Sequence, residues 1–321
     1  MVEQILPNIY RIVVPLPRNP LKAVNSYVIK GENRNLIVDT AMNRPECLEP
    51  LQRGLAELAI DMQRTDLFIT HMHADHAGLV ADLATPESRC FIGHSDADII
   101  NEGGDWEEWA AYAVQNGFPA EFVEGAIRNH PGYKYATREP VDFIIVSEGQ
   151  ELVVGDYRFT CLYTPGHTDG HVCLYEKERR WLLSGDHLLR DITSNISVFE
   201  EEKNPLQDYL TSLDRVGELD VQLVLPGHRR VFQDYRERIQ ELQAHHQERA
   251  EEVYALLGQG DLDAYQIAAG MTWDMSYGWD AFPLQQRWFA VGEALAHLRY
   301  LEVQGRVGRR SVADRTVYTR H

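Results

Sequence analysis

Short apolar runs rich in β-branched residues occupy much of the N-terminal part of the chain. They cover residues 9–16, 25–31 and 34–40, and turn-forming residues such as Gly31 and Asn33 separate the last two. Runs of this length bounded by turn formers are typical of β-strands. We therefore expect the chain to begin as a meander of strands.

The pattern becomes mixed after residue 45. Leucines recur at spacings of 3, 4 and 3 from Leu48 to Leu58, which predicts a helix over about 46–62. A shorter helix is expected over 77–84. Strands interleaved with helices in two groups indicate a layered α/β domain. The further strands are expected at 67–70, 89–93, 157–164, 171–176, 180–184 and 221–225.

An aromatic-rich insertion over about 96–147 interrupts this order. One interpretation is a helical excursion that only packs its aromatic side chains. The other is a lid over an active site. The pattern does not separate these two interpretations.

The tail predicts a second, smaller domain over 231–321, after a first domain over 1–230. A long helix over 232–257 precedes further helical segments, and a Gly- and Arg-rich turn at 305–310 precedes the last strand. This is the order of a winged helix, and its arginines could line the wing. Buttressing of the first domain or homodimer formation is favoured over nucleic-acid binding, because the tail has no aromatic stacking motif.

Charge supports this division and limits the partners. The formal net charge is −18, yet residues 229–321 carry 12 basic and 13 acidic residues, so the acidic excess lies almost entirely in the first 228. Capture of nucleic acid requires Lys and Arg to displace phosphate counterions, so the balance argues against it. No basic leader and no run of about 18 apolar residues occurs, which predicts a cytoplasmic protein without membrane contact.

The most informative stretch is residues 70–76, Thr-His-Met-His-Ala-Asp-His, directly after an apolar strand. Side chains alternate in an extended segment, so His71 and His73 point the same way. A turn into the helix expected near Ala77 can bring Asp75 and His76 to the same point. These imidazoles and this carboxylate predict a metal site.

Three other strand ends offer further ligands. Thr-Pro-Gly-His ends at His167, Ser-Gly-Asp ends at Asp186 and Leu-Pro-Gly-His ends at His228. In each case an apolar strand enters a Gly-containing turn that presents one ligand-type residue, where function is commonly found. The four cysteines lie far apart without a CxxC pair, which argues against a disulfide framework or a thiolate zinc site.

On these motifs the chain resembles the metallo-β-lactamase superfamily, whose HxHxDH signature here runs from His71 to His76. The resemblance implies an α/β fold, a four-layer αβ/βα metallo-β-lactamase sandwich, with a dinuclear centre at the joint edge of its sheets. It also implies that Asp39 supports the ligands by hydrogen bonding. The implied ligands are His71, His73 and His167 for one ion, Asp75, His76 and His228 for the other, and Asp186 between them.

Segments around 204–210, 245–249 and 296–301 resemble the subgroup with a small C-terminal winged-helix domain. That subgroup includes proteins similar to hydroxyacylglutathione hydrolases and to a lactamase-like endoribonuclease. The expected function is therefore hydrolysis of an acyl bond, such as a thioester or lactone, by a hydroxide that bridges two ions. The alternative is a metal-dependent endoribonuclease or phosphodiesterase acting on single strands.

The ligand set indicates which metal ions fit and which charge the substrate carries. Imidazoles and carboxylates without thiolate suit Zn²⁺ first, with Fe²⁺ or Mn²⁺ as alternatives. Asp186, at a position where β-lactamases commonly have Cys, favours a bridged hydrolase-type pair, and Asp75 would orient the hydroxide. The net positive charge of such a centre would attract an anionic small molecule. His171 is expected to support the ligands or to pack rather than to bind metal. A non-hydrolytic redox protein is disfavoured, because the diiron relatives usually carry Glu at the second His of the signature.

Overall fold

The computed structural model describes residues 1–321, and its first β-sheet has seven strands in the spatial order β1 to β7. The first four strands pair antiparallel as a meander, and β4, β5, β6 and β7 pair parallel. The meander predicted from the β-branched runs is therefore present. The strands are β1 (Val2–Leu6), β2 (Ile9–Pro15), β3 (Ala23–Ile29), β4 (Asn35–Val38), β5 (Thr65–Phe68), β6 (Cys90–Ile92) and β7 (Phe143–Ile145).

A second sheet has five strands in the order β12-β11-β10-β9-β8. Its strands pair antiparallel except for β11 and β12, which are parallel. As a result β9, β11 and β12 all run in the same direction and end at the same edge. The strands are β8 (Glu151–Val154), β9 (Tyr157–Tyr163), β10 (Val172–Glu176), β11 (Trp181–Gly185) and β12 (Leu223–Pro226).

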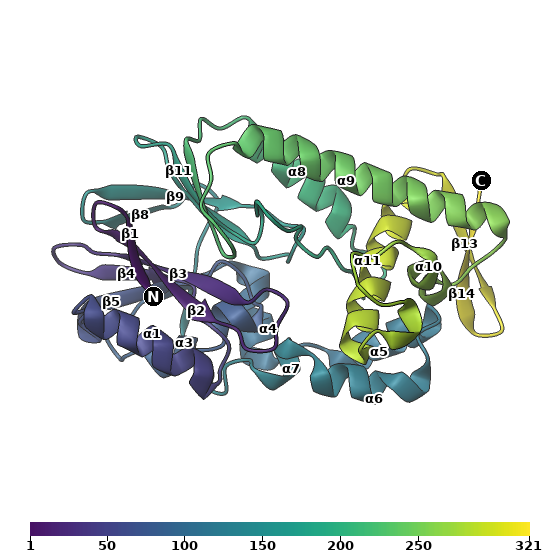
Figure 1. The fold of residues 1–321 in the computed structure, drawn as a ribbon, viewed down its shortest axis with the longest axis horizontal. Helices are drawn as coiled ribbons and strands as arrows, with labels where there is room; N and C mark the ends of the chain where they lie inside the picture. Colours follow the sequence, from purple (N-terminus) through teal and green to yellow (C-terminus); the bar gives the residue numbers. More distant parts are fainter. The chain divides into compact units, whose positions relative to one another are not determined.

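The core lies between the two sheets and behind the first one. Alternate residues such as Leu36 and Phe68 of the first sheet pack with Phe159 and Leu174 of the second. The intervening residues face the opposite way, against α1 (Pro45–Glu57) and the helices that follow β5. Figure 1 shows α1 and α3 (Val80–Leu83) on the side of the first sheet that faces away from the second. This layering of helices and two sheets is the α/β arrangement that the sequence predicts.

The sheets position the chemistry through their strand ends. The parallel strands β4, β5 and β6 end one beside the other; Asp39 directly follows β4, Gly93 directly follows β6, and Thr70 is the second residue after β5. Since carboxyl ends of parallel strands meet at one edge, side chains of these loops come together there. In the second sheet His167 follows β9, and Asp186 directly follows β11.

Contacts divide the chain into two compact units in a way that differs from the expected domains. Unit 1 contains residues 1–104, 134–194 and 212–239, and both sheets belong to it. Unit 2 contains residues 105–133, 195–211 and 240–321. The helices are α1 (Pro45–Glu57), α2 (Ala74–Ala77), α3 (Val80–Leu83), α4 (His94–Glu102), α5 (Trp106–Gln115), α6 (Ala120–Asn129), α7 (Pro131–Lys134), α8 (Pro205–Gly217), α9 (Tyr235–Leu256), α10 (Ala264–Gly270) and α11 (Leu284–Val303).

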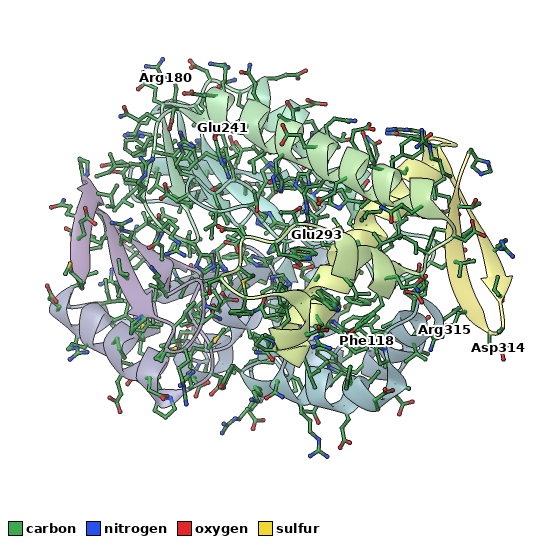
Figure 2. The ribbon with its side chains drawn as sticks, turned by 45° about the vertical axis from the view of Figure 1, so that its right-hand side comes forward. Phe118, Arg180, Glu241, Glu293, Asp314 and Arg315 are labelled. Carbon is green, nitrogen blue, oxygen red and sulfur yellow. The ribbon has the colours of Figure 1, made fainter.

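Unit 2 combines much of the insertion with the tail. The insertion residue Phe118 is 1 % exposed, and its ring lies 5.5 Å from the Trp288 ring and 5.8 Å from the Tyr265 ring. Figure 2 labels Phe118 where the insertion meets the C-terminal helices. Helix α11 leads into an antiparallel hairpin of β13 (Val307–Val312) and β14 (Arg315–Arg320). The aromatic side chain of Phe118 therefore belongs to the core of unit 2.

Several elements differ from the sequence-based expectation. The helix expected to begin near Ala77 is two short helices, α2 and α3, and α2 begins at Ala74. Strands β1, β7 and β8 and helix α8 were not expected. In β7, Ile144 and Ile145 are 42 % and 39 % exposed, so this edge strand has no buried alternating face to reveal it. No helix is long and apolar enough to cross a membrane.

Candidate metal centre

The signature loop after β5 carries four of the predicted ligands. Because α2 begins at Ala74, Asp75 and His76 lie in its first turn rather than before it. His71 and His76 are fully buried, and Asp75 is 7 % exposed. The extended residues before the helix and the first helical turn therefore present their side chains to one point, as the sequence predicted.

The structure brings all seven predicted ligand residues together within unit 1. In each of two groups the ligand atoms lie within 4.8 Å of one another. The first ligand group consists of His71, His73 and His167, and the second ligand group consists of Asp75, His76 and His228. Asp186 clusters in the same way with His71 and His76, so it lies at both groups.

Donor-to-donor distances provide a test of fit to metal ions. A tetrahedral zinc ion with bonds of about 2.0–2.2 Å separates its ligand atoms by about 3.3–3.6 Å. His76 Nε2 lies 3.3 Å from His228 Nε2, and His228 Nε2 lies 3.4 Å from Asp75 Oδ2. His71 Nε2 lies 3.1 Å from His73 Nδ1. The two separations in the second group match the edges of a tetrahedral coordination shell, and the separation between His71 and His73 is shorter by about 0.2 Å.

The bridging position of Asp186 fits the same interpretation. Its Oδ2 lies 3.3 Å from His228 Nε2 and 3.7 Å from His167 Nε2, and its Oδ1 lies 3.5 Å from His76 Nε2. Oδ1 is buried and accepts no hydrogen bond. A Cβ at Gly227 would lie 2.5 Å from this oxygen, so only glycine leaves the space beside it. The residues present fit two divalent cations.

Asp39 orients ligands of both groups. It follows β4 with a positive φ of 61°. Its Oδ2 accepts hydrogen bonds from His76 Nδ1 at 2.7 Å and from the Thr70 hydroxyl at 2.9 Å, and its Oδ1 accepts one from the Thr70 amide at 2.8 Å. The Thr70 hydroxyl oxygen lies 3.0 Å from His71 Nδ1 and can accept a hydrogen bond from it. These hydrogen bonds hold His71 and His76 in the tautomer with the proton on Nδ1, which leaves the lone pair of Nε2 available to a metal.

Three further hydrogen bonds orient His228 and Asp186. His228 Nδ1 donates to the Ala23 carbonyl at 2.7 Å, which again leaves Nε2 for a metal. His171 Nε2 accepts a hydrogen bond from the Asp186 amide at 3.2 Å, and its Nδ1 lies 2.8 Å from the Thr164 hydroxyl. His171 thus supports the backbone of Asp186, and both of its nitrogens already have partners.

The pKa values of two histidines are lowered in the first ligand group, and those of two histidines are raised in the second. Burial lowers the pKa of His73 to about 3 and that of His71 well below its usual value, and neighbouring imidazoles add to this. These rings are neutral at pH 7. Burial also opposes charge on His76 and His228, but the Asp186 carboxylate outweighs it and raises the pKa of His228 to about 10 and that of His76 well above its usual value. A cation bound there would displace protons.

Sequence reasoning missed two buried polar residues of this region, Thr70 and Asp96. Thr70 links Asp39 to His71. Asp96 is fully buried at the start of α4 and had been assigned to the irregular insertion. A signal existed, because Asp96 follows β6, the next parallel strand beside β5. A carboxylate shortly after that strand could have been placed near the same sheet edge, although its hydrogen-bond partners could not.

This arrangement defines a metallohydrolase-type centre, and comparison with known proteins gives the family. The Metallo-beta-lactamase superfamily model matches residues 19–228, so the chain belongs to that superfamily. The model of the Metallo-beta-lactamase-like C-terminal domain matches residues 280–320. The predicted family and the predicted enzyme class, a hydrolase, are confirmed. The narrower subgroup and the winged helix stay predictions.

Individual relatives agree with this assignment. The chain is 27 % identical over 294 residues to the probable metallo-hydrolase YqjP of Bacillus subtilis, with 87 % of each chain covered. It is 25 % identical to the human acyl-coenzyme A thioesterase MBLAC2 over 220 residues, and this match covers 65 % of the present chain and 74 % of MBLAC2. The crystal structure of the metallo-beta-lactamase family protein TTHA1429 from Thermus thermophilus superposes with a TM-score of 0.84, 33 % identity, and coverage of 99 % and 100 %.

Proposed function

We propose that this chain hydrolyses the acyl bond of a small-molecule substrate, with a thioester or a lactone as the substrate class, at a centre of two divalent ions. Zinc is the ion proposed first, with Fe²⁺ or Mn²⁺ as alternatives. The observation that carries the proposal is the convergence of seven side chains whose ligand atoms lie within 4.8 Å of one another in each group, with the shortest separation at 3.1 Å. A cytoplasmic location and a homodimer remain predictions from the sequence.

Two bound ions would supply a hydroxide at neutral pH and positive charge for the developing oxyanion. The residues of the chain perform the other tasks. Asp75 would accept a hydrogen bond from the attacking water and orient it. Burial opposes the charge of this carboxylate, but the neighbouring His228 and His76 outweigh burial and hold its pKa at about 2, so it stays ionised. Asp39 and Ala23 hold the imidazoles of the second ligand group in the tautomer that leaves Nε2 free.

Acyl transfer is supported by the ligands and by one relative. With aspartate at position 186, the donor set consists of oxygen and nitrogen atoms only. Carboxylate oxygens are hard donors, and metal ions held by them can bind a bridging oxygen ligand without a thiolate in the donor set. The name of MBLAC2 gives an acyl-coenzyme A thioesterase activity to that protein. At 25 % identity, this relative supports a thioester as the first substrate class to test.

The phosphodiesterase alternative depends on arginines of the C-terminal hairpin being available to phosphates. In unit 2, Arg306 pairs with Glu251 at 2.7 Å and Arg310 with Asp261 at 2.5 Å. Arg309 lies 2.9 Å from Glu302. Each of these three positive charges is balanced by a neighbouring carboxylate, which reduces the charge that this region offers for counterion release. This observation favours the small-molecule function.

An activity panel tests the proposal. Metal-free protein should turn over acyl-thioesters or lactones only after addition of Zn²⁺, Mn²⁺ or Fe²⁺. Asp75→Ala should lower kcat/KM by about 10²–10⁴-fold, the range expected for loss of a positioned acid or base. Asp98→Asn is a matched control, because Asp98 is an exposed aspartate of α4. Turnover of single-stranded RNA but not of any acyl substrate would contradict the proposal.

A further inference from the structure

Asp96 is a fully buried aspartate in the first turn of α4, and its carboxylate accepts three hydrogen bonds. The Met72 amide donates to Oδ2 at 2.7 Å, the Thr168 hydroxyl donates to Oδ2 at 2.7 Å, and the Gly170 amide donates to Oδ1 at 2.8 Å. None of the seven ligands is among these partners. The carboxylate is therefore outside the metal centre but hydrogen-bonded to its supporting loops.

These three donors come from the two loops that carry the first ligand group. Met72 lies between His71 and His73, and Thr168 directly follows His167. The loops are far apart in sequence and extend from different sheets. One carboxylate thus ties together the backbone segments of all three imidazoles of the first ligand group.

The packing around Gly93 indicates that the helix is fixed closely against the second loop. A Cβ at Gly93, which immediately precedes α4, would lie 2.0 Å from the Gly170 carbonyl oxygen. Backbone approaches backbone directly here, so no larger side chain could be accommodated without a shift. Together with the three hydrogen bonds, this contact leaves the Gly170 loop little freedom relative to α4.

Holding this carboxylate in the interior is unfavourable by itself. Burial raises the pKa of Asp96 to about 6, and the hydrogen bonds from Thr168, Met72 and Gly170 only partly offset it. A buried carboxylate is commonly satisfied by several donors, and each bond to it is stronger than a neutral one.

We propose that Asp96 is a positioning residue for the first ligand group. By accepting hydrogen bonds from Met72, Thr168 and Gly170, it holds the loop of His71 and His73 and the loop of His167 at the separation that one metal ion requires. Partners that orient metal ligands commonly change metal affinity by about 10–100-fold when they are removed. This inference rests on the proposed dinuclear centre, and it specifies which of the two ions depends on Asp96.

Cobalt titration of the full-length protein tests this inference without a substrate. Metal-free protein is titrated with Co²⁺ while the visible absorption of bound Co²⁺ is followed, and competition with a chelator gives the two affinities. In Asp96→Asn, only one acceptor oxygen remains for three donors. We expect one Co²⁺ to bind as in the wild type and the other to bind about 10–100-fold more weakly, with an altered absorption band.

Two further variants keep the test decisive. Thr168→Val removes one donor to Oδ2 with almost no change in side-chain shape, and should weaken the same ion by a smaller factor. Asp98→Asn, on the exposed face of α4, should bind both ions as the wild type does. If Asp96→Asn fails to fold, Thr168→Val decides, and a wild-type spectrum and affinity in that variant overturn the inference.

The other outcomes separate this inference from the proposed function. Wild-type binding of both ions by Asp96→Asn, or equal weakening of both ions, would show that Asp96 does not position the first ligand group. A wild-type protein that binds two Co²⁺ but hydrolyses no acyl substrate would contradict the proposed function and leave the Asp96 result standing. A wild-type protein that binds no Co²⁺ would overturn both.

Discussion

Replacement of Asp39 by Asn is the most informative single change at the metal centre. Asn is one of the few residues that accept the positive φ of 61° at this position, so the backbone can stay in place. The amide oxygen can still accept the Thr70 amide hydrogen bond. The NH₂ group then faces His76 Nδ1 in place of the oxygen that accepted its proton.

The magnitude follows from this change of partner. With a donor opposite, His76 must carry its proton on Nε2, which is the atom that faces Asp186 and His228. The second ligand group would lose one neutral nitrogen donor unless the ring rearranges. Loss of such an orienting partner costs about 10–100-fold in affinity or activity. This is about 1.4–2.7 kcal/mol, since each tenfold corresponds to about 1.36 kcal/mol.

Isothermal titration with Zn²⁺ and kcat/KM on a thioester measure the effect. We expect Asp39→Asn to weaken the ion of the second ligand group more than the ion of the first. Thr70→Val should show the reverse order, because it removes the hydroxyl that joins Asp39 to His71 and leaves the hydrogen bond between Asp39 and His76 in place. If Asp39→Asn binds both ions with wild-type affinity and turns over within about twofold of the wild type, the tautomer argument is refuted.

Three further predictions concern unit 2. Burial lowers the pKa of His246 to about 2 and that of His297 to about 4. Because the unfolded chain binds more protons below about pH 6.5, the free energy of unfolding should fall from there towards pH 4 by up to about 1.4 kcal/mol per pH unit for each histidine. Urea titrations followed by tryptophan fluorescence would measure it, and an unchanged slope in His297→Gln would contradict it. Phe118→Ala should lower the stability of unit 2 by about 3–5 kcal/mol in the same assay, whereas the 56 % exposed Tyr133 should tolerate Ala. Arg310→Ala should leave thioester turnover unchanged. If the wild type binds RNA, and the salt dependence of that binding decreases in Arg310→Ala, the nuclease function is favoured instead.

The sequence predicts ligand residues well where a strand ends in a short, unusual turn. His167, Asp186 and His228 each follow an apolar run and a glycine, and the fold brings them to one sheet edge. Helix α8 could have been predicted, because Leu206, Tyr209, Leu213 and Val216 recur at spacings of 3, 4 and 3 and are all buried. It was identified only as a family-like segment.

Other features depend on tertiary contacts that no local pattern contains. The hydrogen bonds of Asp96 join residues 72, 168 and 170, and nothing in the sequence around position 96 indicates partners so far away. The packing of Phe118 against Trp288 likewise unites an insertion with the distant tail. Hydrophobic pattern indicates which faces are buried, but not which buried faces meet.

The most direct test of the central claim is an anomalous difference map from crystals of the protein reconstituted with Zn²⁺ or Mn²⁺. The account predicts two peaks about 3.5–4 Å apart, one enclosed by the first ligand group and one by the second, with Asp186 between them. No peak at these side chains, or a single peak that touches only one group under saturating metal, would contradict a dinuclear centre.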